Sequence, residues 1–255
     1  MADQTIPEPI KKIADEANQA ARAESEPPHV RRYRAVLFRG AMLSIICAFA
    51  VLTFLVKTAP SFSIDLQITK AIQEIHSPFF FGLMSAISWP GFSPQSMIIA
   101  ALIILLIGGF GLHWEAVAAL IAVVFSIAIN LLVKDLVQRP RPASSLVNVY
   151  ATLTSYSFPS GHVMFYLGFF GFIGFLAFSL LKPSIKRSLM LVIIGIFIVL
   201  IGPSRIFLGE HWASDVLGAY LLGSLTLVAA IQFYIWGKPR YFVHQPVAAA
   251  TTKQT

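Results

Sequence analysis

Long apolar runs separated by short polar segments dominate this chain and limit what it can fold into. Of its 255 residues, 56% are hydrophobic and only 12% are charged, where soluble domains carry roughly 25% charged residues. An apolar run in lipid is expected to be a helix, because a lone strand would leave its backbone groups unpaired. The predicted spans are residues 36–56, 95–112, 116–133, 162–181, 188–202 and 216–236. The chain is therefore predicted to be all-α, a polytopic membrane helix bundle with about six transmembrane helices.

Polar sequence flanks this apolar part at both ends. Residues 1–35 are predicted to form a polar cytoplasmic tail, 36–236 the membrane domain and 237–255 a second cytoplasmic tail. The first tail carries a weak amphipathic pattern, which fits a helix lying on the membrane surface as well as a flexible chain. The segment 78–89 is open between an interfacial helix and the start of the second span, before a break at Pro90.

The distribution of Lys and Arg predicts the orientation. With the N-terminus inside, thirteen of the 19 cations fall on the cytoplasmic side, which favours both termini in the cytoplasm. The net charge is +7, but the cations cluster between apolar runs, as the flanking charges of membrane spans do. We therefore expect contact with membrane lipids and no nucleic-acid partner. The only cysteine, Cys47, lies in an apolar run, so no intrachain disulfide can form.

Three short polar segments carry the residues capable of chemistry. They are residues 134–142 after the third span, residues 159–162 at the start of the fourth, and residues 204–215 between the fifth and sixth. Because consecutive spans alternate in direction, these segments should meet at one membrane face. In the predicted orientation, that face is the outer one.

The three segments resemble the signature of the type 2 phosphatidic acid phosphatase superfamily. The patterns Lys-x6-Arg-Pro, Pro-Ser-Gly-His and Ser-Arg-x5-His-x3-Asp match at all eleven specified positions, in order. The resemblance covers residues 36–236, and soluble vanadium haloperoxidases share the site pattern. It implies a membrane enzyme that removes phosphate from a lipid through a phosphohistidine intermediate, with no metal and no cofactor.

Phosphate binding is assigned to five matched positions. Lys134, Arg141 and Arg205 bring three cations beside an apolar bundle, where unpaired charge is costly and a functional site is expected. Arginine forks match phosphate oxygens in a bidentate manner, and lysine adds a point charge. Ser160 and Gly161 open the fourth span, where free N–H groups and the helix dipole favour an anion.

Catalysis is assigned to two histidines and an aspartate. His211 and Asp215 are four residues apart and share one face of a helix. Asp215 can accept a proton from one ring nitrogen of His211, which leaves the other nitrogen free to attack phosphorus. The resemblance implies that His211 becomes the phosphohistidine and that His162 protonates the leaving oxygen as general acid.

A metal site is the competing interpretation of the same residues. His162, His211, Glu210 and Asp215 offer ligands that zinc accepts. Three converging cations would instead repel a divalent metal and attract an anion, so Glu210 is expected to pair with a neighbouring cation. Arg139 lies between the matched positions, and we expect it to anchor the span end at the lipid headgroups.

The lipid itself is less constrained than the phosphoryl end. Members of the family that the segments resemble act on undecaprenyl diphosphate, phosphatidylglycerophosphate, phosphatidic acid and related lipids. An outer-face site in a bacterial cytoplasmic membrane would suit recycling of the polyprenyl diphosphate carrier. The alternatives are a lipid headgroup phosphotransferase and a non-enzymatic transporter or scaffold, while six spans disfavour haloperoxidase chemistry. The oligomeric state stays open.

Overall fold

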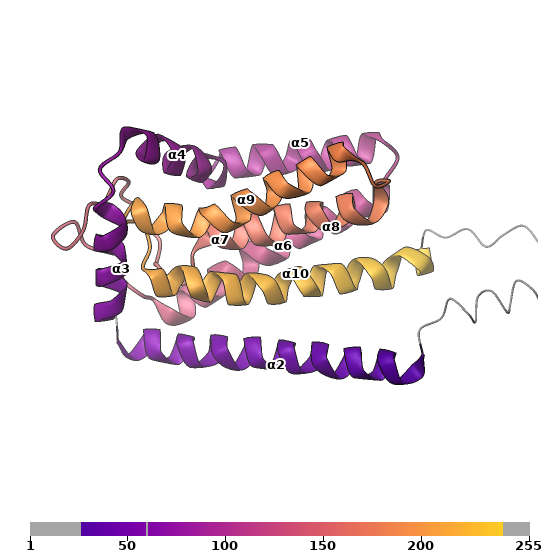
Figure 1. Ribbon diagram of the computed structural model, residues 1–255, viewed down its shortest axis with the longest axis horizontal. Coiled ribbons are helices and arrows are strands. Elements are labelled where there is room, and N and C mark those ends of the chain that lie inside the picture. Colours follow the sequence, from indigo (N-terminus) through magenta and orange to yellow (C-terminus); the bar gives the residue numbers. More distant parts are fainter. Residues whose placement is uncertain (1–26, 60, 242–255) are drawn as a thin grey trace, which may run out of the picture. The chain divides into compact units, whose positions relative to one another are not determined.

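The computed structural model describes residues 27–59 and 61–241, and every regular element in that part of the chain is a helix (Figure 1). Two units divide the chain, residues 1–44 and residues 45–255. In the first unit, the described residues form the beginning of α2 (Pro28–Thr58). The amphipathic pattern predicted for the first tail lies outside the described residues, as does residue 242 onward.

Within the described residues, five helices are long and apolar enough to cross a membrane. They are α2, α6 (His113–Val137), the continuous stretch Gly161–Leu180, α9 (Ile185–Phe207) and α10 (Ala213–Tyr241). The stretch Gly161–Leu180 consists of α7 (Gly161–Phe165), the π-helical turn η2 (Tyr166–Phe170) and α8 (Gly171–Leu180). These helices confirm the predicted all-α, polytopic membrane bundle.

The second predicted span is a bent pair of helices. α4 (Pro78–Ser88) and the short η1 (Trp89–Gly91) meet α5 (Gln95–Gly109) at an angle of 62°. The 15 residues of α5 measure about 22 Å as a helix, too short for a core of about 30 Å, so only the pair together provides a sixth span. The break covers residues 92–94, directly after Pro90 and Gly91, where the sequence predicted it, and Pro90 itself lies in η1.

Helix ends extend beyond the apolar runs that predicted them. α2 begins at Pro28 rather than at residue 36, and α10 continues to Tyr241 rather than ending at residue 236. Hydropathy marks the part of a helix that lipid covers, whereas good helix formers carry the backbone pattern into the polar flank. The helices therefore include residues on both sides of the apolar part, 36–236.

One helix was not predicted from the apolar runs. α3 (Ser63–Gln73) has buried polar residues Asp65, Thr69 and Gln73, which are spaced four apart and share one face. Figure 1 shows α3 standing across the end of the bundle where α9 gives way to α10, and α3 contacts both. Its polar face is therefore turned toward that end of the bundle.

Small and aromatic side chains fill the interior of the second unit. Ala118, Ala119 and Ala122 of α6 are buried and let neighbouring helices approach closely, as small residues do in membrane bundles. Phe169 and Phe172 are fully buried from the stretch Gly161–Leu180. Large apolar side chains on the outer faces are exposed, as expected of surfaces that lipid covers.

Candidate active site

The three polar segments predicted from the sequence meet at the end of the bundle that α3 crosses. Arg141 Nη1 donates to the Glu210 carbonyl at 2.6 Å and lies 3.3 Å from His211 Nε2, which joins the first segment to the third. The Ser160 amide donates to the Asp215 carbonyl at 3.3 Å, which joins the second to the third. The predicted convergence of the three segments at one end of the bundle is confirmed.

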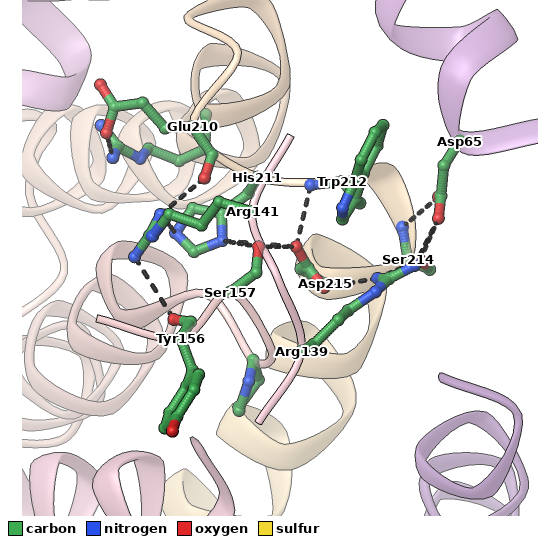
Figure 2. A network of polar contacts seen from close by, with 12 residues as sticks. Asp65, Arg139, Arg141, Tyr156, Ser157, Glu210, His211, Trp212, Ser214 and Asp215 are labelled. Atoms are coloured by element: carbon green, nitrogen blue, oxygen red, sulfur yellow. Dashed lines mark hydrogen bonds and ion pairs between the residues drawn. The ribbon is translucent and has the colours of Figure 1, made fainter. Parts of the chain in front are cut away.

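The Asp215 carboxylate and the Ser157 hydroxyl both face Nδ1 of the His211 ring, each at 3.5 Å. The Oδ2 atom of Asp215 lies 3.5 Å from His211 Nδ1 and accepts hydrogen bonds from the Ser157 hydroxyl and the Trp212 amide (Figure 2). His211 is 1% exposed and Asp215 is 0% exposed. Since Nδ1 faces the carboxylate and Nε2 faces a guanidinium N–H, these contacts favour the tautomer with its proton on Nδ1. The Nε2 lone pair is then available for attack.

The surroundings of His211 also keep its ring uncharged. Burial is the largest cause, and the cations Arg141, Lys134 and Arg205 add to it, so that the pKa of His211 is lowered well below its ordinary value of about 6.5. A neutral imidazole is the nucleophilic form. The contacts place the lone pair on Nε2, and the lowered pKa keeps the ring in the uncharged form that has this lone pair.

A glycine turn precedes His211 and leads the chain from α9 into the site. Gly209 has φ +68°, and a Cβ there would lie 2.0 Å from the Asn148 carbonyl oxygen, so only glycine fits. Gln73 of α3 braces the same turn by donating to the carbonyls of Asn148 at 2.7 Å and Phe207 at 2.8 Å. α3 thus fixes the loop that carries the third motif.

Lys134 and Arg141 come from the end of α6 and the loop that follows. Gln138 adopts a left-handed conformation that ends α6 and turns the chain back. Lys134 is buried and donates to the carbonyls of Tyr156 and Ser157. Arg141 is held by Ser155, whose carbonyl accepts from Nε at 2.7 Å. Burial lowers the pKa of Arg141 to about 10, against the opposing effect of Asp215, so it remains a cation at neutral pH.

Arg205 lies fully buried near the end of α9. It donates to the Ser88 hydroxyl and pairs with the Glu210 carboxylate, which confirms the predicted pairing of Glu210 with a neighbouring cation. Its guanidinium lies 5.0 Å from the centre of the Phe92 ring. The break between α4 and α5 therefore supplies one wall of the site.

The same wall contacts His162. The Phe92 and His162 rings meet edge to face with their centres 4.6 Å apart, and a Cβ on Gly91 would lie 2.3 Å from His162 Cδ2. Arg205, His211, Arg141 and Lys134 are the charged and titratable neighbours that act on the His162 ring. The charged residues predicted from the three motifs thus lie close enough to one another to interact.

Five buried polar atoms of this group have no hydrogen-bond partner in the described part of the chain, and two of them, Arg205 Nη2 and Glu210 Oε2, face each other in the ion pair. The other three are the Ser160 hydroxyl, His162 Nε2 and Arg205 Nε. Buried polar atoms in proteins are almost always paired, and each exception calls for an explanation. An anion bound among them would supply acceptors for these atoms.

The predicted role of Arg139 as a headgroup anchor is wrong. Its side chain is 1% exposed, and its guanidinium pairs with Asp65 at 2.8 Å and with Asp215 at 2.5 Å. The sequence did not predict that Asp65 lies beside Arg139, because the predicted spans do not include α3 and so do not place it against the bundle. Ser157 and Ser88 were missed as well, since no motif covers them. The four-residue spacing of the buried polar face of α3 was the one available signal.

The alternative metal site is not assembled as a ligand cluster. Among residues 27–59 and 61–241, no group of three or more His, Cys, Asp and Glu side chains is placed to hold a metal ion. The carboxylate of Glu210 faces Arg205, and that of Asp215 faces Arg139 and Ser157.

Comparisons with known proteins show the family to which the chain belongs. The family model of the PAP2 superfamily matches residues 115–238. Phosphatidylglycerophosphatase B of Bacillus subtilis (strain 168) is 31% identical over 190 residues, which cover 72% of this chain and 89% of the relative.

Two solved structures resemble the fold. The transmembrane PAP2 type phosphatidylglycerolphosphate phosphatase from Bacillus subtilis has a TM-score of 0.68 at 27% identity, covering 79% of this chain and 98% of its own. Aquifex aeolicus LpxE has a TM-score of 0.54 at 19% identity, covering 68% and 97%, and supports the fold alone. The chain is a multi-pass membrane protein with the fold and motifs of a lipid phosphatase, and it belongs to the PAP2 superfamily.

Proposed function

We propose that this lipid phosphatase hydrolyses a phospholipid monophosphate such as phosphatidylglycerophosphate, through a covalent phosphohistidine at His211. The observation that carries the proposal is the set of unpartnered buried atoms on Ser160, His162 and Arg205, which lie beside a neutral, oriented imidazole. A phosphoryl group would give each of these atoms a partner and would meet the His211 Nε2 lone pair. No metal is required, because the chain itself supplies the positive charge.

Binding is assigned to three cations and the start of the fourth span. Lys134, Arg141 and Arg205 would neutralise the phosphoryl oxygens, with the two guanidinium groups acting as forks. The Ser160 hydroxyl and the Gly161 amide lie at the N-terminal end of a helical stretch, where the dipole favours an anion. The transition state spreads charge over these oxygens, so this shell of donors should supply most of the rate enhancement.

The reaction has two chemical steps. First, the His211 Nε2 lone pair forms an N–P bond while the P–O bond to the lipid breaks, and His162 gives its proton to the departing oxygen. Second, water attacks the phosphohistidine, His162 takes a proton from that water, and the N–P bond breaks to release inorganic phosphate. Asp215 holds the Nδ1 proton throughout and stabilises the charge that develops on the ring.

The substrate assignment follows the named relative. A protein 31% identical to this chain is called phosphatidylglycerophosphatase B, which favours a glycerophospholipid monophosphate. Undecaprenyl diphosphate is the second candidate. The distribution of Lys and Arg predicts a site on the outer face, which would suit recycling of this lipid carrier. That distribution supports cytoplasmic termini and a site on the outer face, and the bacterial relatives favour a bacterial cytoplasmic membrane. We assign residues 36–236 to the phosphatase domain, and residues 1–35 and 237–255 to flanking segments.

Phosphate release by the purified protein tests the proposal. The panel contains phosphatidylglycerophosphate, phosphatidic acid and undecaprenyl diphosphate in the same detergent, and the first is expected to give the highest kcat/KM. His211→Ala should abolish release, while His113→Ala, the same change at an exposed histidine, should leave it unchanged. Retained turnover in His211→Ala would overturn the nucleophile assignment.

Two additions separate this reaction from its alternatives. EDTA should leave the rate largely unchanged, and strict dependence on added magnesium or zinc would contradict the metal-free mechanism. An added alcohol acceptor should leave inorganic phosphate as the main product. A product containing the acceptor, formed at the expense of phosphate, would identify a phosphotransferase instead.

A further inference from the structure

Arg139 connects two buried carboxylates. Its Nη2 atom donates to Asp65 Oδ2 at 2.8 Å, and its Nη1 atom donates to Asp215 Oδ1 at 2.5 Å (Figure 2). The relative exposure of the three residues is 0–1%. Arg139 therefore lies directly behind the carboxylate that faces His211, on the side away from the proposed phosphate.

Asp65 is fixed as firmly as its partner. Its Oδ1 atom accepts from the Ser214 amide at 2.8 Å, and its Oδ2 atom accepts from the Ser214 hydroxyl at 2.6 Å as well as from Arg139. The Ser214 oxygen in turn accepts from Arg139 Nη1 at 2.7 Å. Ser214 lies in the first turn of α10, one residue before Asp215. α3 is thus tied to the segment that carries Asp215.

The two oxygens of Asp215 have separate partners. Oδ1 accepts from Arg139, whereas Oδ2 accepts from the Ser157 hydroxyl and the Trp212 amide and faces His211 Nδ1. The terminal torsion of an aspartate is broad, so one oxygen alone would not set the plane of the carboxylate. Arg139 supplies the second fixed point.

We propose that Asp65 and Arg139 are positioning residues that set the plane of the Asp215 carboxylate and thereby the orientation of the His211 ring. The inference rests on the proposed function of His211. Asp65 pairs with the Arg139 guanidinium, and the guanidinium donates to Asp215 Oδ1. Asp215 Oδ2 in turn faces the Nδ1 proton of His211. Neither residue touches substrate, so their loss should slow the chemical step without weakening phosphate binding.

A purely structural role is the competing explanation, since breaking a buried ion pair destabilises a fold. That role predicts less folded protein but an unchanged kcat for each folded molecule. A positioning role predicts a lower kcat in protein that is folded. The two roles are therefore separated by kinetics normalised to active-site or folded-protein concentration.

The variants are Asp65→Asn, Arg139→Lys and Arg139→Gln, each purified in detergent and checked for thermal unfolding. Glu74→Gln is the matched control, because it makes the carboxylate-to-amide change at an exposed residue that caps the same helix. We expect kcat for phosphate release to fall about 10- to 100-fold in all three variants, with KM within about twofold of the wild-type value. Arg139→Lys should be the least impaired, because lysine keeps the charge and loses only the fork.

The pH dependence of kcat/KM gives a second readout, because a loss of folded protein lowers the rate at every pH without shifting the profile. The charged groups facing His211 are Asp215, Arg141, Lys134 and Arg205. Arg139→Gln removes a cation beside Asp215, which favours the imidazolium form of His211, so the acidic limb of kcat/KM should move to higher pH. Should Arg139→Gln not fold, Arg139→Lys and Ser214→Ala decide the question through their kcat values.

Wild-type kcat and an unchanged pH profile in folded Asp65→Asn and Arg139→Lys would overturn the positioning role. If His211→Ala is inactive in the same assay, the proposed function would survive that result. Full activity in His211→Ala would instead overturn both. A fall in kcat at constant KM, absent from Glu74→Gln, supports the proposal.

Discussion

Arg141 Nη1 lies 3.3 Å from His211 Nε2, so the guanidinium proposed to bind phosphate is held directly against the nitrogen proposed to attack it. The other ring nitrogen faces Asp215, and the Arg141 guanidinium is itself fixed by the Glu210 carbonyl and by Ser155. A phosphoryl oxygen bound by this fork would therefore bring phosphorus close to Nε2. Holding reacting groups in this manner is a large part of what an enzyme contributes to a bimolecular step.

Gly91→Ala should displace the His162 ring. A Cβ at position 91 would lie 2.3 Å from His162 Cδ2, closer than atoms can approach, so the ring or the backbone beside it must shift. A misplacement of about 1 Å at a reacting group can cost about 100-fold in rate, so we expect a loss of kcat/KM of that order. Phosphate-release kinetics measure it.

Gly82→Ala is the control for this change. Gly82 lies in α4, close to the same break, and a Cβ there would meet nothing within 4 Å. The control should keep wild-type activity, and equal losses in the two variants would show that the effect is on helix packing rather than on His162.

Arg141→Lys should lower kcat/KM by about 100-fold, because lysine cannot bind a phosphoryl group while also reaching the Glu210 and Ser155 carbonyls. Inhibition by orthovanadate should weaken in parallel, since vanadate mimics the five-coordinate transition state. Arg187→Lys makes the same change at a half-buried arginine in the first turn of α9, at the end of that helix away from Arg205. That control should change neither quantity, and vanadate inhibition of wild-type strength in Arg141→Lys would contradict the role of Arg141.

The acidic limb of the pH profile should lie below about pH 6.5. The pKa of His211 is lowered, so at any given pH the ring carries fewer protons than an ordinary histidine and stays nucleophilic as the pH falls through 6.5. Activity is then lost only at lower pH, when the ring finally takes up a proton. The measurement is kcat/KM against pH with a monophosphate and a diphosphate lipid.

The limb common to both lipids belongs to the enzyme, because the phosphate groups of the two substrates ionise differently. An acidic limb that lies above pH 7 with both lipids would contradict a neutral, buried His211.

The sequence predicts the membrane bundle and the motif residues of the site, because local patterns of residues are enough to identify both. Apolar runs locate the spans because lipid permits only helices there, and motif spacing places His162, His211 and the three cations. Alternation of spans was enough to predict that the segments carrying them meet. All of these inferences depend on local pattern or on chain direction.

What sequence reasoning missed depends on tertiary contacts. Arg139 was assigned to the headgroups because a lone cation at a span end usually lies there, and only the position of α3 reveals Asp65 beside it. Ser88 and Phe92 reach Arg205 because α4 and α5 are bent by 62°, an angle that no residue pattern specifies. The motif residues were predictable, whereas most of the residues that hold them in place were not.

Trapping the covalent intermediate tests the central claim most directly. Purified protein is mixed with phosphatidylglycerophosphate carrying a radiolabelled terminal phosphate, quenched in alkali within milliseconds, digested and analysed by mass spectrometry. We predict an acid-labile, alkali-stable phosphoryl group on the peptide that contains His211, absent from His211→Ala. Full turnover with no labelled peptide at any quench time, or label on another residue, would contradict the account.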